Sequence, residues 1–377
     1  MPFCYYCNNP ITAGNKSQEH VIPNAIGGRL KSYTLLCEAC NQLLGRTIDM
    51  ELASQFESLV VLLGLERDRK KDNIIRNVVA HDGNLYNLVD GRNPVRVKPI
   101  IIEHDNGVQI SVRDKKQLMQ VIAGLQRKHP NLDLNGLEEK IKYTEALLNE
   151  RWNIPLNTGG EVFLKAVAKI AINVHLQLGG DRKNISAVLE VLKGNIANES
   201  HIHYHYIPES LNWDGEEIVH LVQLNGNSDK GILYAFVVLF SAFSFIVNLD
   251  DIYKGDDYKA TYAYDVVEGK KVQKHVAVDY DGRLEYLKLL SEIEEQEINT
   301  TIINSVQANV NRVMLVADVR QKRKTMAEVL ARTRQEVYSK YPPGTRITKE
   351  MVNELVNVAS PKLAKLWINW GKEDAGA

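Results

Sequence analysis

Four cysteines near the start constrain this chain more than any other feature. Cys4 and Cys7 form one Cys-x-x-Cys pair, and Cys37 and Cys40 form a second. Two residues between the members of a pair let one tight turn aim both sulfur atoms at the same ion, so two such pairs are typical of a tetrahedral zinc site. Because four thiolates saturate the ion, we predict a structural zinc with no open position for a substrate.

The segment between the two cysteine pairs is longer than the ~15–20 residues usual between zinc knuckles. It carries the run Glu19-His20-Val21-Ile22-Pro23, followed by the glycine pair Gly27-Gly28. Leu36 precedes the second cysteine pair, and Asn41 directly follows it. An acid, a histidine and a glycine turn within a zinc module indicate that the module carries chemistry as well as structure.

These elements resemble the HNH, or ββα-metal, endonuclease family in its four-cysteine subtype. The family's acid-His element with an apolar-x-Pro tail matches Glu19 to Pro23, and its glycine-rich hairpin loop matches Gly27-Gly28. Its closing Leu-Cys-x-x-Cys-Asn element matches Leu36 to Asn41. The resemblance covers about the first sixth of the chain. It implies a two-stranded hairpin followed by a helix, with one divalent metal held between them.

The sequence departs from the family pattern at two positions. The family usually has a structural Asn in the second hairpin strand, where this chain reads Ser32-Tyr33-Thr34. A Ser or Thr hydroxyl can bond to nearby backbone in the same way, so we expect it to tie the loop instead. The acidic position is Glu19 rather than the commoner Asp. We expect this longer carboxylate to reach a metal as well.

The resemblance implies a division of roles for phosphodiester hydrolysis. His20 is the expected general base, because an imidazole with a pKa of about 6.5 can accept a proton from the attacking water. Glu19 and Asn41 are the expected ligands of a catalytic Mg²⁺ or Mn²⁺, since their oxygens suit a hard cation. Basic residues near the motif are our candidates for phosphate contact in a nucleic acid: Lys16, Arg29, Lys31 and Arg46.

Composition limits the remaining interpretation. The 377 residues are 44% hydrophobic and 25% charged, as in a soluble globular protein of two or three domains. The net charge of −1 means that affinity for nucleic acid must come from local basic patches. No basic, apolar export signal precedes the cysteines, so we expect a cytoplasmic protein. Gly231 to Leu249, the longest apolar stretch, favours sheet over a membrane span.

We predict an α+β fold, with a small zinc-stabilised ββα-metal module followed by a larger mixed α/β region. Hydrophobic periodicity and turn signals divide the chain into four parts. These parts are an HNH module at 1–62, a linker and mixed strand and helix region at 63–150, a helix plus antiparallel sheet domain at 151–283, and a helical region at 284–377.

Several elements follow from the same patterns. Alternation between 73 and 113 predicts short strands, and the sequence from Lys115 to about Leu148 predicts a helix. The apolar stripe from Glu161 to Leu178 predicts a buried helix. Residues 217–266 predict about four strands, with a turn at Asn225-Gly226-Asn227.

The C-terminal region is predicted to be helical from Leu284 onward. Pro342-Pro343-Gly344 should break the helix, and Thr348 should cap the next one. We expect Trp367 and Trp370 to dock the end of the chain. The basic stretch from Arg320 to Lys340 suits either contact with phosphates or a solvated helix face, and the two interpretations stand side by side.

Two further polar patterns have open interpretations. His201, His203 and His205 alternate with Ile and Tyr, so in an extended strand they would share one face. Such a face could bind a metal, or it could be a neutral half-exposed strand. The charged run from Glu66 to Asp72 is typical of a solvated connection.

The leading hypothesis is therefore a metal-dependent HNH endonuclease acting on DNA, with RNA as the alternative substrate. The resemblance implies restriction or antiphage defence, with a C-terminal region that recognises DNA, senses a ligand, or assembles a homo-oligomer or binds an activating protein. We also hypothesise that this region restrains the nuclease. The alternatives are a homing nuclease of a mobile element, and a non-catalytic zinc module that binds nucleic acid or protein. We expect no membrane partner.

Overall fold

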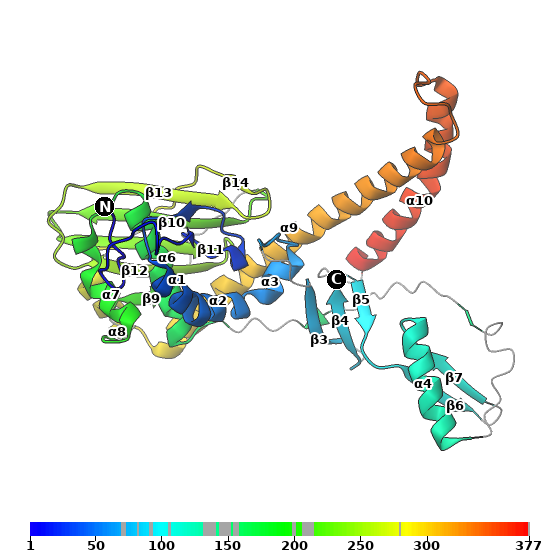
Figure 1. The fold of residues 1–377 in the computed structure, drawn as a ribbon, viewed down its shortest axis with the longest axis horizontal. Helices are drawn as coiled ribbons and strands as arrows, with labels where there is room; N and C mark the ends of the chain where they lie inside the picture. Colours follow the sequence, from blue (N-terminus) through cyan, green and yellow to red (C-terminus); the bar gives the residue numbers. More distant parts are fainter. Residues whose placement is uncertain are drawn as a thin grey trace. The chain divides into compact units, whose positions relative to one another are not determined.

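The computed structural model describes residues 1–68, 73–80, 83–89, 93–104, 107–130, 141–142, 152–153, 158–197, 201–205, 215–278 and 280–375. It is a mixed structure of helices and sheets, as predicted (Figure 1). Residues 1–146 and 150–313 form one compact unit, and residues 314–377 form the main part of a second. The finer division into four parts stays a prediction.

The N-terminal segment has the predicted order of two strands followed by a helix. These elements are β1 (Glu19–His20), β2 (Lys31–Ser32) and α1 (Glu38–Leu44). The strands are antiparallel, with His20 opposite Lys31. Between them, a single turn of 3₁₀ helix, η1 (Asn24–Ile26), ends at Gly27, whose φ of 94° favours glycine.

The helical run continues beyond α1 through η2 (Gly45–Asp49), α2 (Met50–Gln55) and α3 (Glu57–Leu62). It ends just before Gly64. Leu44, Ile48 and Leu52 are buried and form its apolar face, whereas Leu43 is 47% exposed and lies off that face.

The middle region contains the predicted short strands. One sheet has the order β5-β4-β3-β8, and β6 pairs with β7 in a separate hairpin. Their bounds are β3 (Ile74–Ala80), β4 (Leu85–Val89), β5 (Asn93–Arg96), β6 (Ile100–His104), β7 (Gly107–Ser111) and β8 (Trp152–Asn153). The helix predicted from Lys115 is α4 (Lys115–Lys128). The rest of that prediction falls largely on 131–140 and 143–150, outside the described residues.

The main sheet has six antiparallel strands in the order β14-β13-β10-β11-β12-β9. They are β9 (Ile202–Tyr204), β10 (Val219–Asn227), β11 (Ile232–Leu239), β12 (Phe243–Asp250), β13 (Tyr258–Asp265) and β14 (Lys270–Lys271). The turn predicted at Asn225-Gly226-Asn227 is wrong, because these residues still pair within the sheet. The chain turns just after them, where the Asn227 side chain accepts a 2.7 Å bond from the Lys230 N–H.

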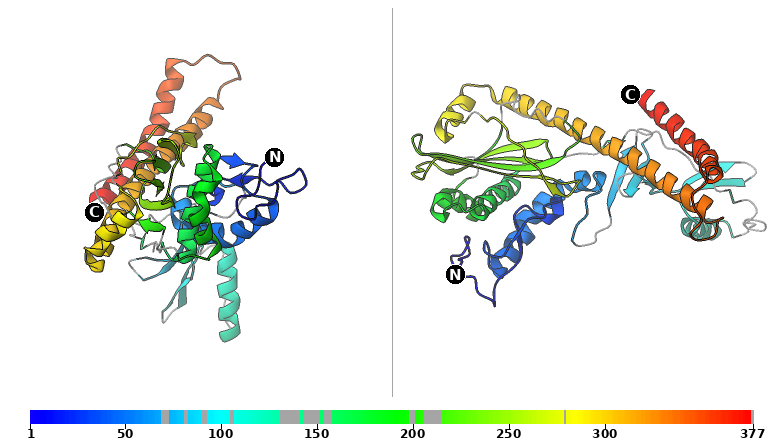
Figure 2. Two further views of the ribbon diagram at one scale, coloured as in Figure 1. Left: turned by 90° about the vertical axis from the view of Figure 1, so that its left-hand side faces the viewer. Right: turned by 90° about the horizontal axis from the view of Figure 1, so that it is seen from above.

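Both faces of the main sheet are covered (Figures 1 and 2). The predicted buried helix is α6 (Glu161–Gln177), which packs on one face together with η3 (Arg182–Ile185) and α7 (Ser186–Lys193). On the other face, Val276, Tyr280 and Tyr286 belong to one core cluster with strand residues. Tyr286 lies on α8 (Arg283–Ser291).

The N-terminal module shares a core with this sheet. The Phe56 side chain, at the junction of α2 and α3, is fully buried. Its ring centroid lies 5.6 Å from that of Phe163 on α6, 5.0 Å from Phe240 and 4.9 Å from Phe243. The side chain of Gln55 also exchanges two hydrogen bonds with the backbone of Gly159, at 2.9 and 2.7 Å. The zinc module therefore packs on the α6 side of the sheet.

The C-terminal helices are α9 (Glu295–Tyr338) and α10 (Lys349–Ala375). The predicted cap is present, because the Thr348 hydroxyl accepts a 3.3 Å bond from the Met351 N–H. The predicted docking of Trp367 is wrong, because this side chain is 63% exposed. Its ring meets that of Trp370 edge to face, with the centroids 6.3 Å apart. Within the described residues, no helix is both long and apolar enough to cross a membrane.

Candidate functional site

The four cysteines meet at one point. Their Sγ atoms all lie within 4.8 Å of one another, and those of Cys7 and Cys37 are 3.7 Å apart. A tetrahedral zinc with Zn–S bonds of about 2.3 Å requires sulfur atoms about 3.8 Å apart. The donor set and its spacing therefore fit a structural zinc ion. Cys37 stands at the N-cap of α1, so the metal would join the helix to the N-terminal turn.

The side chains of Ser32 and Thr34, which were expected to replace the family's structural Asn, bond to each other and to the local backbone. The Ser32 Oγ accepts a 3.4 Å bond from the Thr34 N–H and lies 3.1 Å from the Thr34 Oγ1. Side chains of this length commonly hold a local turn in this way. They fix the chain between β2 and the second cysteine pair.

A groove of about 1120 Å³ runs beside the hairpin and the following helices. His20 and Asn41 line it together, so the structure brings two of the three predicted catalytic residues to one surface. Arg46, Asp49 and Asp68 line the same groove. The groove is the candidate substrate site, since an imidazole, an amide and carboxylates face a common space.

His20 is held in a form suited to accept a proton. Its Nε2 lies 3.3 Å from Asp68 Oδ2. Burial lowers the pKa of His20 below its ordinary value, and the nearby Lys31 ammonium lowers it further, although Asp68 opposes both effects. A lowered pKa keeps the imidazole neutral near pH 7, which is the form of a general base.

Asn41 is fixed in the first turn of α1. Its Nδ2 donates to the Ser17 Oγ at 3.0 Å and to the Gln18 carbonyl at 3.2 Å. Both bonds use the amide nitrogen, so the orientation of the amide is set. The Oδ1 atom is then the ligand atom that Asn41 can offer to a cation.

Glu19 occupies the opposite side of β1 from His20, because successive strand residues point to opposite faces. It is 2% exposed and does not belong to the described residues that line the groove. Its Oε1 lies 2.7 Å from Lys169 Nζ and accepts a 3.0 Å bond from Asn173 Nδ2, both on α6. Burial raises the pKa of Glu19 above its ordinary value, although Lys169 opposes this.

Comparison with known families agrees with this geometry. Residues 4–57 match the family model described as HNH endonuclease. The N-terminal segment is an HNH module. No curated protein and no solved structure shows significant similarity to the chain.

The donor chemistry of the HNH module suits a hard divalent ion. Asn41 offers an amide oxygen, and Glu19, Asp49 and Asp68 offer carboxylates, which are the ligand types that Mg²⁺ and Mn²⁺ take. Glu19, however, already has one oxygen engaged by Lys169 and Asn173. Its role as a metal ligand stays a prediction, as do the catalytic roles of His20 and Asn41.

Three charged residues of the site were missed by sequence reasoning. Asp68 lies in the charged run interpreted as a solvated connection, yet it contacts His20 and accepts from Arg29 and Lys31 at 3.3 and 3.0 Å. Asp49 contacts Lys169 through both carboxylate oxygens, at 2.9 and 2.7 Å. Of the three, Lys169 could have been noticed in the sequence, because a cation within the apolar stripe of a predicted buried helix needs a buried partner.

The predicted phosphate-binding residues are distributed unevenly around the HNH module. Arg46 lines the groove. Arg29 and Lys31 converge on Asp68 beside His20. Lys16 lies opposite Cys37 in an isolated antiparallel backbone bridge, and it is not among the described residues that line the groove. Contact of these four residues with nucleic acid stays a prediction.

The three alternating histidines are not assembled into a metal cluster. Among the described residues, the four cysteines are the one group of three or more His, Cys, Asp or Glu side chains arranged to hold an ion. His203 lies 5.5 Å, ring to ring, from Tyr286, and His205 lies 4.9 Å from Phe236. The structure thus favours packing against aromatic rings for this strand.

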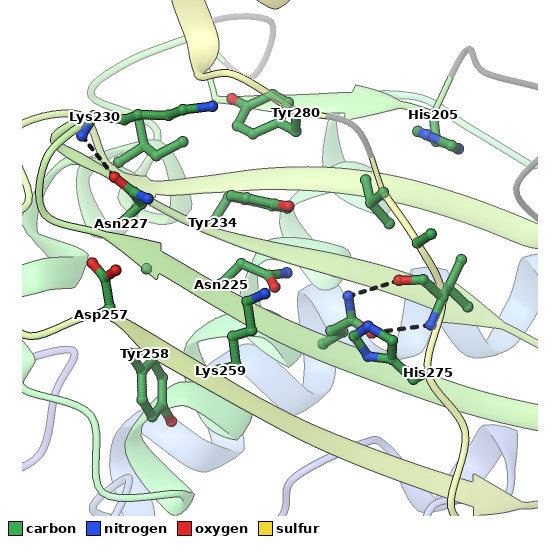
Figure 3. A pocket seen from close by; sticks show the side chains of 16 residues that line it. His205, Asn225, Asn227, Lys230, Tyr234, Asp257, Tyr258, Lys259, His275 and Tyr280 are labelled. Carbon is green, nitrogen blue, oxygen red and sulfur yellow. Dashed lines mark hydrogen bonds between the residues drawn. The ribbon is translucent and has the colours of Figure 1, made fainter.

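A second pocket, of about 950 Å³, lies on the main sheet away from α6 (Figure 3). Asn225 of β10 stands directly opposite Tyr234 of β11 and Lys259 of β13, so the three side chains share one face. The Asn225 Nδ2 is buried without a hydrogen-bond partner within the described structure. His275 and Tyr280 line the same space.

Proposed function

We propose that this protein is a metal-dependent endonuclease that hydrolyses DNA phosphodiester bonds in the groove beside β1. One observation carries the proposal. A neutral His20 and an oriented Asn41, from two elements of a zinc-tied HNH module, face the same groove. A zinc-binding module with a purely structural role does not require His20 and Asn41 to face one groove.

His20 would act as the general base. The imidazole faces the groove with its Nε2 beside Asp68, and burial favours its neutral form. It can therefore accept a proton from a water molecule that attacks a phosphorus atom. The Asp68 carboxylate would stabilise the imidazolium formed in that step, because an adjacent negative charge favours the protonated ring.

A bound Mg²⁺ or Mn²⁺ would supply positive charge to the phosphate oxygens and to the departing oxygen. Asn41 would hold it in the groove through its amide oxygen. Glu19 is the second expected ligand, although its side chain is buried on the other side of β1 and its Oε1 is engaged by Lys169 and Asn173. The amide of Asn41 is held in one orientation, because its nitrogen donates to Ser17 and Gln18 and leaves the oxygen available for the ion. Arg46 would contact a neighbouring phosphate from the same groove.

The biological role that we propose is restriction or antiphage defence, which HNH nucleases with a long appended region often serve. The alternatives are a homing nuclease and a non-catalytic zinc module. Of the roles considered for the appended region, ligand sensing is favoured by a specific observation. The pocket on the main sheet presents an unpaired amide donor, Asn225, opposite the cationic Lys259.

Plasmid cleavage tests the catalytic proposal. Wild-type protein should cut DNA with added Mg²⁺ or Mn²⁺ and should not cut in EDTA. His20→Ala should lower the rate by about 10²-fold or more, because it removes the base. His104→Ala is the matched control, since it removes an exposed histidine from β6 outside the HNH module.

The cleavage result separates the alternatives. Equal cutting by wild type and His20→Ala would refute the assignment of the base. A protein that binds one zinc, folds and never cuts any DNA or RNA substrate would favour the non-catalytic module. Cutting at a single long site would favour the homing nuclease.

Thermal unfolding tests the sensing role. A nucleotide or another small organic anion should raise the Tm of the wild type, and Lys259→Met should abolish that rise. Lys254→Met is the control, because Lys254 is not among the described residues that line the pocket. An unchanged Tm across a broad panel of phosphates and carboxylates would argue against a sensor at this pocket.

A further inference from the structure

An exposed tyrosine lies next to the groove, on the hairpin that carries His20. Tyr33 directly follows β2 and is 50% exposed. It is not among the described residues that line the groove, but its hydroxyl accepts a hydrogen bond from the Nε2 atom of Gln18, which lines the groove. The tyrosine therefore stands at the edge of the candidate substrate site.

The register of the hairpin places Tyr33 on the same face as His20. His20 pairs with Lys31 across β1 and β2, and continuing this register by one residue places Gln18 opposite Tyr33. Opposite residues of two strands share a face, and alternate residues of one strand do so too. Glu19, between Gln18 and His20, is 2% exposed and belongs to the other, buried face. The face with the expected general base thus also carries a cation, an amide and an aromatic ring.

Hydrogen bonds hold the Tyr33 ring at this edge. The Gln18 carbonyl accepts a 3.2 Å bond from Asn41 Nδ2, and the Gln18 side chain donates to the Tyr33 hydroxyl. The hydroxyl end of the ring is thereby tied to the wall of the groove. A tyrosine has only two side-chain torsions, so a ring held in this way offers a large contact surface at a low cost in conformational entropy.

A ring at this position lies within reach of a base near the scissile phosphate. Tyr33 is two residues beyond Lys31, which is about 7 Å along an extended chain. A stacked nucleic acid strand advances by about 3.4 Å per nucleotide. The ring is therefore about two nucleotides from a phosphate bound between His20 and Lys31.

The aromatic ring selects for a particular state of the base. Every base has a flat π-face that can stack on an aromatic side chain, so such contacts are tolerant of sequence. Inside a duplex, both faces of a base are covered by its neighbours. A base must therefore be single-stranded or turned out of the helix before it can stack on a side chain.

We propose that Tyr33 stacks on an unstacked base of the nucleic acid bound in the groove, so that the protein prefers single-stranded or locally unpaired DNA to a continuous duplex. The proposal rests on the proposed function, because it takes the scissile phosphate to lie at His20, and it adds the class of substrate. Tyr33 is a specificity-determining residue in this scheme, since it contacts a base and not the reacting phosphate.

Binding of oligonucleotides to the full-length, zinc-loaded protein tests the stacking without cleavage. Fluorescence anisotropy without added Mg²⁺ or Mn²⁺ gives the Kd for a single strand and for the duplex of the same sequence. Wild type should bind the single strand more tightly. Tyr33→Ala should weaken that binding by about 5- to 150-fold, the range for the loss of one base–aromatic stack, and should leave the Kd for the duplex unchanged.

Two further variants separate the ring from other effects. Tyr33→Phe should bind the single strand like wild type, because it keeps the ring. Phe3→Ala is the matched control, since Phe3 is a 53% exposed aromatic residue of the same module and is not among the described residues that line the groove. It should also bind like wild type. The Tm of each variant should match that of wild type, because neither side chain is buried.

A strand that contains 2-aminopurine, a fluorescent adenine analogue quenched by stacking, reports the contact directly. Its emission should fall on binding to wild type and Tyr33→Phe, and should not fall with Tyr33→Ala. Equal Kd values of wild type and Tyr33→Ala for the single strand, or an equal loss in Phe3→Ala, would overturn the proposal. Failure of the nuclease assignment would appear instead as absent cleavage with the Tyr33-dependent binding intact.

Discussion

His220 joins the zinc hairpin to the main sheet. The free energy of unfolding should therefore change with pH as this side chain takes up a proton. The side chain is fully buried on β10. Its Nδ1 accepts a 3.1 Å bond from the Phe240 N–H, so the ring hydrogen lies on Nε2, which donates to the Ile26 carbonyl at 2.8 Å. Only the neutral ring satisfies both bonds. Burial accordingly lowers the pKa of His220 from 6.5 to about 4.

The sign and size of the effect follow from these values. Well above pH 6.5 the His220 ring is neutral in both the folded and the unfolded chain, so a change of pH does not alter the free energy of unfolding through His220. As the pH falls below 6.5, the unfolded chain takes up a proton that the folded chain refuses, and stability is lost. The loss between pH 7.5 and 5.5 is about 1.3 kcal/mol, and it approaches about 3 kcal/mol below pH 4.

Urea unfolding of wild type and His220→Gln measures this contribution, with zinc present throughout. The variant should be less stable at about pH 7.5, because the Phe240 N–H loses its acceptor. The difference in the free energy of unfolding between the two proteins should be about 1.3 kcal/mol smaller at pH 5.5. Burial also lowers the pKa of His205 to about 4, so only the difference between the two proteins isolates His220. An equal difference in the free energy of unfolding at both pH values would refute the assignment of this pH dependence to His220.

Two further predictions concern what holds the HNH module. Cys37→Ser should lose the bound zinc in a metal assay and unfold the hairpin, because a structural zinc contributes on the order of ten kcal/mol; a variant that kept zinc would contradict the four-thiolate site. Phe56→Ala should cost about 3–5 kcal/mol in urea unfolding, because it removes a fully buried ring packed on three others. A cost below about 1 kcal/mol would show that the module does not share the core of the sheet.

Much of the fold could be predicted because local patterns are strong in this chain. The apolar stripe of α6 and the short apolar runs of β11 and β12 each follow from neighbouring residues. The errors arose where local and tertiary preferences compete. Asn225-Gly226-Asn227 has turn composition, but ladder bonds with two neighbouring strands hold it in β10. Trp367 was expected to dock the end of the chain, yet it remains exposed.

The sequence by itself determined the zinc ligands and the pair formed by His20 and Asn41. A Cys-x-x-Cys turn aims its two sulfurs at one ion, and the second pair places Asn41 in the first turn of α1. His20 was assigned by its resemblance to the HNH pattern. Only the tertiary structure decided what surrounds them. Lys169 meets Glu19 across 150 residues of chain, and Asp68 meets His20 across 48. Such contacts depend on how α6 packs against the hairpin, and no local pattern encodes that packing.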